Sequence, residues 1–297
     1  MESQFIEISP DTVIHLRLVK EASVSDKSPL LVFLHYWGGS SSTWYKLTSP
    51  ASQWSLSSQY ASVALDFRGW GQSTGPEQAA AATAKDYSVT PNASDLVTVL
   101  ERLKSNPATA GLVRNGIVLI GHSMGGKVAL AALGKASDDI LRLIKGLVLV
   151  APAPPTPLVL PPEMSEQQKR AYDTAESVQW TVQNVLSTPL AKDDVSLIVR
   201  DSRAGSQLAT EGWILHGMQE NIVAALDNVS SREIKVSVLA GELDVVEQKD
   251  RVKSEVVETL SAKGFLVTFA VVEGVKHLIP LEKPEAVRRA VEELLVN

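Results

Sequence analysis

One serine of this sequence has neighbours that could make it a nucleophile. Ser123 stands at the centre of the sequence GHSMG (residues 121–125), after an apolar run over 117–120 and before an alanine-rich segment over 124–133. This order predicts a strand, a sharp turn and a helix, with a glycine two residues away from the serine on each side. Such a turn strains the serine backbone and requires small neighbours. The N-terminus of the helix would stabilise negative charge that develops beside the serine.

A serine hydroxyl becomes reactive when a general base accepts its proton and a carboxylate orients that base. On a turn of this kind the acid and then the histidine follow the serine along the chain, and only His216 and His277 lie after Ser123. His277 follows the last predicted strand, where a loop can reach the turn, so we predict that it is the base. We interpret His216 as a pocket or surface histidine. His122 would point away from its neighbour and is interpreted as structural.

Two carboxylates compete for the role of the orienting acid. Glu242 and Asp244 both follow the apolar run 236–240, at the carboxyl end of a predicted strand. Ligand chemistry in open α/β sheets takes place at that edge. Both residues therefore qualify by position, and we favour Asp244. The other position for an acid, after the run 147–150, holds no carboxylate.

The apolar runs describe the scaffold that these side chains need. Residues 12–19 alternate between apolar and polar side chains, which predicts an antiparallel strand paired with residues 4–8 and places His15 on the solvent side. Later runs are short and continuous, as in parallel strands that are covered on both faces; they are 30–34, 61–65, 117–120, 147–150, 236–240 and 265–272. Helical patterns lie between them, and the last begins near Pro284. We predict a doubly wound, mostly parallel α/β sheet with an N-terminal antiparallel hairpin.

One long segment interrupts this alternation. From Pro152 to about Ser231 no run resembles a strand, and a cluster of prolines precedes helix-prone sequence. A connection of this length is too long to be a plain loop. We therefore predict a helical cap inserted over residues 153–231, within a core domain made of residues 1–152 and 232–297. An apolar pocket is suggested by three large side chains of the cap, which are Trp180, Trp213 and Met218.

Together these motifs resemble the α/β-hydrolase superfamily over nearly the whole chain. The matches come in order: LHYWGG at 34–39, DFRGWGQS at 66–73, the turn around Ser123, and the loops of Asp244 and His277. The resemblance implies the α/β-hydrolase fold. Within the superfamily the chain is similar to the capped, serine-dependent esterases, lactonases and cofactor-free perhydrolases.

The resemblance also implies where the oxyanion of the reaction would bind. The backbone N–H of Met124 would form one half of the oxyanion hole, and the family places the other half at the N–H of Trp37. His35 would brace this loop. Tyr36 stands where the family usually has glycine; it could line the pocket beside Trp37, or the two rings could pack as a pair. The turn of Asp66 and Arg68 looks structural in relatives.

Composition excludes several other classes of function. The chain has no cysteine, which rules out disulfides, thiolate metal sites and a cysteine nucleophile. Its 28 basic and 34 acidic side chains give a net charge of −6, which argues against nucleic-acid or anionic-membrane partners. No secretory signal and no bilayer-spanning run is visible, so a cytoplasmic location is expected.

The sequence therefore predicts a serine hydrolase of the carboxylesterase or lactonase type. A small, largely apolar ester or lactone would be cleaved through an acyl-enzyme, with this small-molecule substrate as the expected partner and with no metal or organic cofactor. The same triad would serve hydrolysis of a carbon–carbon bond or perhydrolysis. A different class is a ligand receptor that keeps the triad and turns over slowly. The serine excludes dehalogenase and epoxide hydrolase mechanisms, which resemble this fold but need an aspartate nucleophile.

Overall fold

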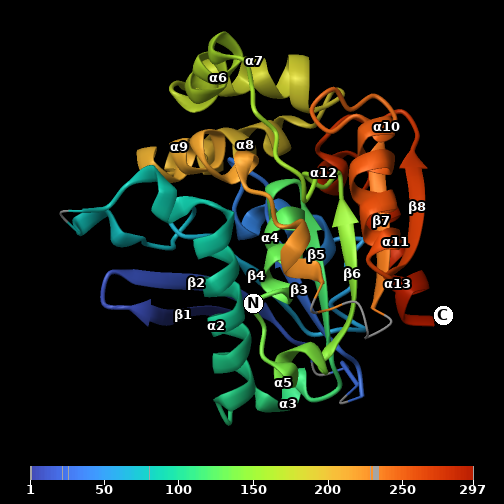
Figure 1. Cartoon of the computed structure of the whole chain (residues 1–297). Coiled ribbons are helices and arrows are strands. Elements are labelled where there is room, and N and C mark those ends of the chain that lie inside the picture. Colours follow the sequence, from blue (N-terminus) through green and yellow to red (C-terminus); the bar gives the residue numbers. More distant parts are fainter. Residues whose placement is uncertain are drawn as a thin grey trace.

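The computed structural model describes residues 2–296 except 22, 26, 80, 228 and 230–233. Its strands form one eight-stranded sheet in the order β1-β2-β4-β3-β5-β6-β7-β8 (Figure 1). From β4 to β8 all neighbours are parallel, and β1 and β2 are antiparallel to theirs. The predicted fold class is thereby confirmed. The strands are β1 Glu2–Ser9, β2 Thr12–Val19, β3 Leu30–Leu34, β4 Ser62–Leu65, β5 Ile117–His122, β6 Ile144–Val150, β7 Lys235–Gly241 and β8 Leu266–Val272.

The N-terminal hairpin is attached to the sheet through β2, which pairs with β1 on one side and with β4 on the other. His15 of β2 is fully buried, and its Nδ1 lies 2.8 Å from Oδ2 of Asp66, which follows β4. The prediction that His15 faces solvent is therefore wrong. Alternation along a strand shows which side chains share a face, but it does not show that a distant turn covers the polar face.

Helices cover both faces of the sheet and bury its central strands. Helices α2 (Val89–Ser105) and α4 (Met124–Leu133) pack on one face, and α1 (Tyr45–Thr48) and α13 (Pro284–Val296) pack on the other. Strand β8 lies at the edge of the sheet and leaves Leu266 52% exposed, so the expectation that this run is covered on both faces is wrong. Among the described residues, no helix has the length and apolar character needed to span a bilayer.

A long inserted segment, residues 151–234, joins β6 to β7. Its described residues form helices and no strand, and the helices lie beyond the carboxyl ends of the parallel strands (Figure 1). The elements used below are α6 (Pro162–Lys169), η4 (Arg170–Tyr172), α7 (Ala175–Thr181), η5 (Val182–Leu186), α8 (Lys192–Ala204) and α9 (Gln207–Leu215). The predicted domain boundary at 231 and 232 lies outside the described residues, and the division into core and cap domains stays a prediction.

Candidate active site

Ser123 occupies a strained turn between β5 and α4. Its φ of 52° and ψ of −115° lie in a region that residues other than glycine rarely adopt. A Cβ atom on Gly121 would lie 2.6 Å from the carbonyl oxygen of Gly125, and one on Gly125 would lie 2.4 Å from that of Leu34. Both glycines are therefore needed for the turn to close against the chain, which is what the predicted geometry requires.

His277 and Asp244 meet at the same edge of the sheet, in loops that follow β8 and β7. Nδ1 of His277 donates to Oδ2 of Asp244 over 2.7 Å, and both residues are buried. The other carboxylate oxygen accepts from the backbone N–H groups of Val246 and Glu247, at 2.7 and 3.0 Å. The carboxylate is thus fixed from both sides, and Nε2 is the ring nitrogen of His277 left to accept a proton.

The charge beside His277 changes its protonation. Burial alone would lower the pKa of this imidazole, but the charge and the hydrogen bond of Asp244, aided by Glu247, outweigh burial and raise the pKa above its ordinary value. Asp244 therefore favours the protonated imidazole. This is the state that a general base reaches when it takes a proton from a nucleophile.

Glu242 is directed away from His277. Its side chain is exposed, and Oε2 accepts from the backbone N–H of Gly274 over 2.9 Å. The loops of Asp244 and His277 nevertheless lie close together: a Cβ on Gly241 would be only 2.1 Å from the carbonyl oxygen of Lys276. Of the two candidate acids, the structure places Asp244 beside the histidine.

His122 connects the turn of Ser123 to the loop of His277. Its Nε2 donates to the carbonyl oxygen of His277 over 2.8 Å, and the two rings lie 5.0 Å apart. Burial, together with the positive charge of His277, holds the pKa of His122 far below its ordinary value. His122 is therefore neutral and holds the strand before Ser123 against the loop of His277. His216, at the end of α9, makes none of these contacts.

The two backbone N–H groups predicted to bind an oxyanion belong to Met124 and Trp37. The N–H of Met124, the first residue of α4, has no acceptor within its helix. The carbonyl of Tyr36 accepts from Nδ1 of His35 over 2.6 Å and from the N–H of Gly39 over 3.0 Å. Because the C=O and N–H of a trans peptide point in opposite directions, the N–H of Trp37 points away from His35. In the described part of the chain it donates to no protein acceptor.

His35 is held in one tautomer. Its Nε2 accepts from the backbone N–H of Phe67 over 3.0 Å while Nδ1 donates to Tyr36. Burial lowers the pKa of His35 to about 4, which keeps the ring neutral and able to make both bonds at neutral pH. His35 thus joins the loop 35–39 to the end of β4, which is the bracing position that the resemblance implies.

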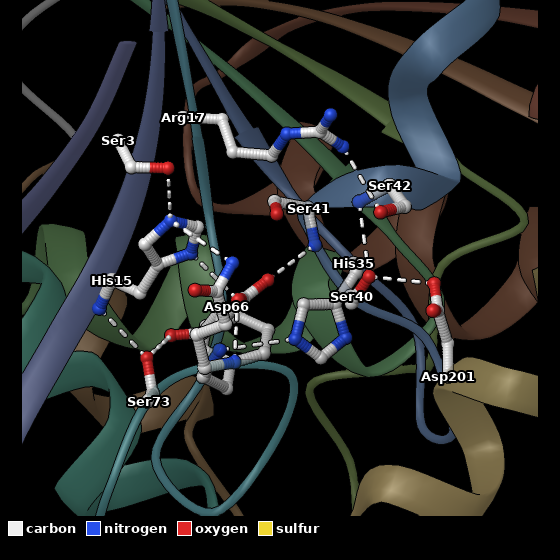
Figure 2. A network of polar contacts seen from close by, with 12 residues as sticks. Ser3, His15, Arg17, His35, Ser40, Ser41, Ser42, Asp66, Ser73 and Asp201 are labelled. Atoms are coloured by element: carbon white, nitrogen blue, oxygen red, sulfur yellow. Dashed lines mark hydrogen bonds and ion pairs between the residues drawn. The ribbon is translucent and has the colours of Figure 1, made fainter.

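A network of polar contacts supports the same loop from the core (Figure 2). Asp66 accepts from His15 and from the backbone N–H of Ser41, over 2.8 and 2.5 Å. Ser3 Oγ lies 3.0 Å from Nε2 of His15, so consecutive contacts link Ser3, His15 and Asp66. Ser3 lies within strand β1 and not on a strained turn. These contacts stabilise the hairpin and the loop after β3. Arg68, bound to Asp95, is also structural.

The predicted pocket residues do not all line one cavity. Trp213 and Met218 are buried and line a small cavity with room for about one water molecule. Trp180 is 55% exposed on α7 and does not line that cavity. Tyr36 is buried with its ring 5.0 Å from that of His122, and Trp37 packs on Tyr172 of η4 at 4.2 Å.

Two buried titratable residues beside the site, Lys127 and Glu247, were missed by sequence reasoning. Lys127 of α4 donates to the carbonyl oxygens of Thr156 and Met218, both over 3.2 Å, and burial lowers its pKa to about 8. Burial likewise raises the pKa of Glu247 to about 8. Both residues line the cavity of Trp213. The available signal was a single lysine inside a helix that is otherwise made of small and apolar residues. No group of side chains within the described ranges is arranged as a metal site.

Comparison with known proteins identifies the family. The chain matches the Alpha/beta hydrolase family over residues 31–290. It therefore belongs to this family of hydrolases, as the resemblance of its motifs indicated. No curated protein sequence matches the chain.

Several solved structures share the fold at low sequence identity. An esterase from Exiguobacterium antarcticum aligns with a TM-score of 0.77 and 18% identity, covering 100% of both chains. A bromoperoxidase from Bacillus anthracis aligns at 0.73 and 16%, again over 100% of both. An enol-lactonase from Burkholderia xenovorans aligns at 0.70 and 15%, covering 96% of this chain and 97% of the lactonase. At these identities the likeness establishes a common fold.

Proposed function

We propose that the chain is a serine hydrolase that cleaves a carboxylic ester or lactone through an acyl-enzyme. The observation that carries this proposal is the buried bond of 2.7 Å between His277 and Asp244, at the edge of the sheet where Ser123 stands on its strained turn. A histidine oriented by a carboxylate is what a serine nucleophile needs. The esterase and lactonase among the similar structures carry such activities on the same fold.

The reaction follows from these positions. Ser123 Oγ attacks the carbonyl carbon while its proton passes to Nε2 of His277, and Asp244 stabilises the resulting imidazolium. The N–H groups of Trp37 and Met124 bind the oxyanion. The proton then passes to the leaving alcohol as its bond to the carbonyl carbon breaks. A water molecule deprotonated by His277 releases the acid and restores the serine.

The burial of the site limits the substrate. Ser123 is 6% exposed, and the ring of Trp37, whose N–H we assign to the oxyanion, packs on that of Tyr172 at 4.2 Å. A small substrate fits this arrangement better than a bulky one, and the aromatic surroundings favour an apolar acyl group.

The nucleophile is tested by labelling with a fluorophosphonate, which phosphonylates an activated serine. Ser3→Ala is a matched control, because Ser3 Oγ lies 3.0 Å from Nε2 of His15, a histidine held by Asp66. We expect wild type and Ser3→Ala to be labelled at equal rates and Ser123→Ala to remain unlabelled. Full labelling of Ser123→Ala would refute the proposal.

The reaction type is tested with short acyl esters, lactones and a diketone, each with and without hydrogen peroxide. Rapid multiple turnover of an ester or lactone without peroxide is expected. Turnover that needs peroxide, or that is confined to the diketone, would replace ester hydrolysis with perhydrolysis or carbon–carbon cleavage. Labelling without turnover of any substrate would favour the ligand receptor.

A further inference from the structure

The inserted segment binds directly to the loop that carries Trp37. Contacts come from η4, α8 and α9, and they reach both the backbone and the side chains of this loop. They are Tyr172 Oη to the carbonyl oxygen of Trp37 at 2.9 Å, Ser202 Oγ to that of Gly38 at 2.8 Å, Trp37 Nε1 to the carbonyl oxygen of Thr210 at 3.1 Å, and Ser40 Oγ to Asp201 Oδ2 at 2.6 Å. Figure 2 shows the last of these beside the Asp66 network.

Residues 36–39 form a tight turn of a type that depends on its central peptide. The N–H of Gly39 donates to the carbonyl of Tyr36 over 3.0 Å, and Gly38 has a φ of +91°. A positive φ at the third residue identifies a type II turn, and a type I turn differs from it by a flip of the peptide between Trp37 and Gly38. Because Gly38 has no Cβ, its own backbone offers little resistance to this flip.

Tyr172 opposes this flip in two ways. Its hydroxyl donates to the carbonyl oxygen of Trp37, which belongs to the peptide that would rotate. Its ring fills the space beside Gly38, where a Cβ atom would lie 2.4 Å from the ring carbon Cε2. Tyr172 is itself buried, and Arg203 donates to its carbonyl oxygen over 2.9 Å. The hydroxyl of Tyr172 is therefore held in a fixed position.

We infer that Tyr172 is a positioning residue for the oxyanion hole. His35 and Gly39 fix the peptide on one side of Trp37, and Tyr172 fixes the peptide on the other side, so both backbone rotations of Trp37 are held. The turn that carries the N–H of Trp37 then keeps one conformation throughout the reaction. Ser202, which binds the next carbonyl along, supports the same turn. The inference rests on the proposed function, because it assigns the N–H of Trp37 to the oxyanion.

The test compares two tyrosine hydroxyls that both join the core to the inserted segment. Tyr172→Phe removes the bond to Trp37. Tyr45→Phe is the matched control, because Tyr45 Oη donates to Asp194 of α8 over 2.8 Å and, among the described residues, forms no hydrogen bond with the turn. Ser202→Ala removes the second contact to the turn and serves as an independent variant if Tyr172→Phe does not fold. The assays are kcat and KM for the best ester substrate and the inhibition constant of a boronic acid, which mimics the tetrahedral oxyanion.

We expect kcat of Tyr172→Phe to fall about tenfold at a KM within about twofold of wild type, since a misdirected donor weakens only the transition state. The boronic acid should bind about tenfold more weakly to this variant, while the carboxylate product binds as before. Ser202→Ala should change kcat in the same direction, and Tyr45→Phe should match wild type in all three measurements. Equal kcat values for Tyr172→Phe and Tyr45→Phe, or a change confined to KM, would overturn the inference.

The two proposals fail in different ways. If wild-type Ser123 is not labelled by the fluorophosphonate, the proposed function is wrong and this inference is wrong with it. If wild type is labelled and active but boronic acid binding is unchanged in both Tyr172→Phe and Ser202→Ala, only the role of the turn is wrong.

Discussion

Replacing Asp244 by asparagine removes the charge beside His277 and keeps the size of the side chain. The size of the expected loss in kcat follows from the geometry, because the pair is buried and the hydrogen bond measures 2.7 Å. Two unit charges about 4 Å apart attract by about 4 kcal/mol at an effective dielectric constant of about 20. Losing this attraction in the transition state slows the reaction about 10³-fold, at about 1.4 kcal/mol per factor of ten. An asparagine amide that donates to Nδ1 also favours the wrong tautomer, so the full loss in kcat is about 10³- to 10⁴-fold.

The pH profile of kcat/KM gives this prediction a second measurement. Activity requires neutral His277, and Asp244 raises the pKa of His277 against the effect of burial, so wild-type activity falls as the pH decreases through this raised pKa. In Asp244→Asn less opposes the lowering of the His277 pKa by burial, so the acidic limb of the profile moves to lower pH. Glu242→Gln is the control, because Glu242 is exposed and binds Gly274. Its kcat should stay within about twofold of wild type. A larger loss in Glu242→Gln than in Asp244→Asn would refute the reasoning.

Two further predictions concern stability, measured by urea unfolding. Gly125→Ala should lower the free energy of unfolding by about 3 kcal/mol, because its Cβ would meet the backbone oxygen of Leu34 at 2.4 Å; an unchanged midpoint would contradict the tight turn. Asp66→Asn should cost about 3 kcal/mol, because it removes the charge that accepts from His15 and Ser41 in a buried site. Burial raises the pKa of Asp66, but these bonds outweigh it and lower the pKa below the ordinary 3.8, so its contribution is present above pH 3.8 and is lost as the pH falls through the lowered value. Wild type should therefore lose more stability than Asp66→Asn in acid, and parallel curves would contradict this.

The sequence predicted the parts of the molecule that local chemistry determines. Helix α4 begins and ends where the alanine-rich segment does, at residues 124 and 133. Its start is fixed by the turn before it, which admits only glycine at two positions. The choice between Glu242 and Asp244 depended on contacts that strand periodicity does not encode. Both follow β7, and the backbone N–H groups of Val246, Glu247 and Gly274 help to set the orientation of each carboxylate.

Burial by distant segments was the part that the sequence did not reveal. The alternation of β2 placed His15 on a polar face, and the turn after β4, far along the chain, covers that face with Asp66. Lys127 was similarly hidden, because the carbonyl groups that bind it belong to Thr156 and Met218 of the inserted segment. In each case the partner that makes burial of the polar group tolerable comes from an element with no local relation to it.

The inserted segment also binds the loop of the base. The carbonyl oxygen of Leu186, at the end of η5, accepts from the backbone N–H groups of His277 and Leu278 over 3.0 and 3.1 Å. Thr188 then donates through its N–H and its hydroxyl to Glu282, over 2.8 and 2.7 Å. Together with the contacts to the turn of Trp37, these bonds tie the same segment to the proposed base and to the proposed oxyanion hole. A change in this segment that admits a larger substrate therefore affects both the base loop and the oxyanion hole. We expect variants that accept larger substrates to have a lower kcat unless the contacts of Tyr172 and Leu186 are kept.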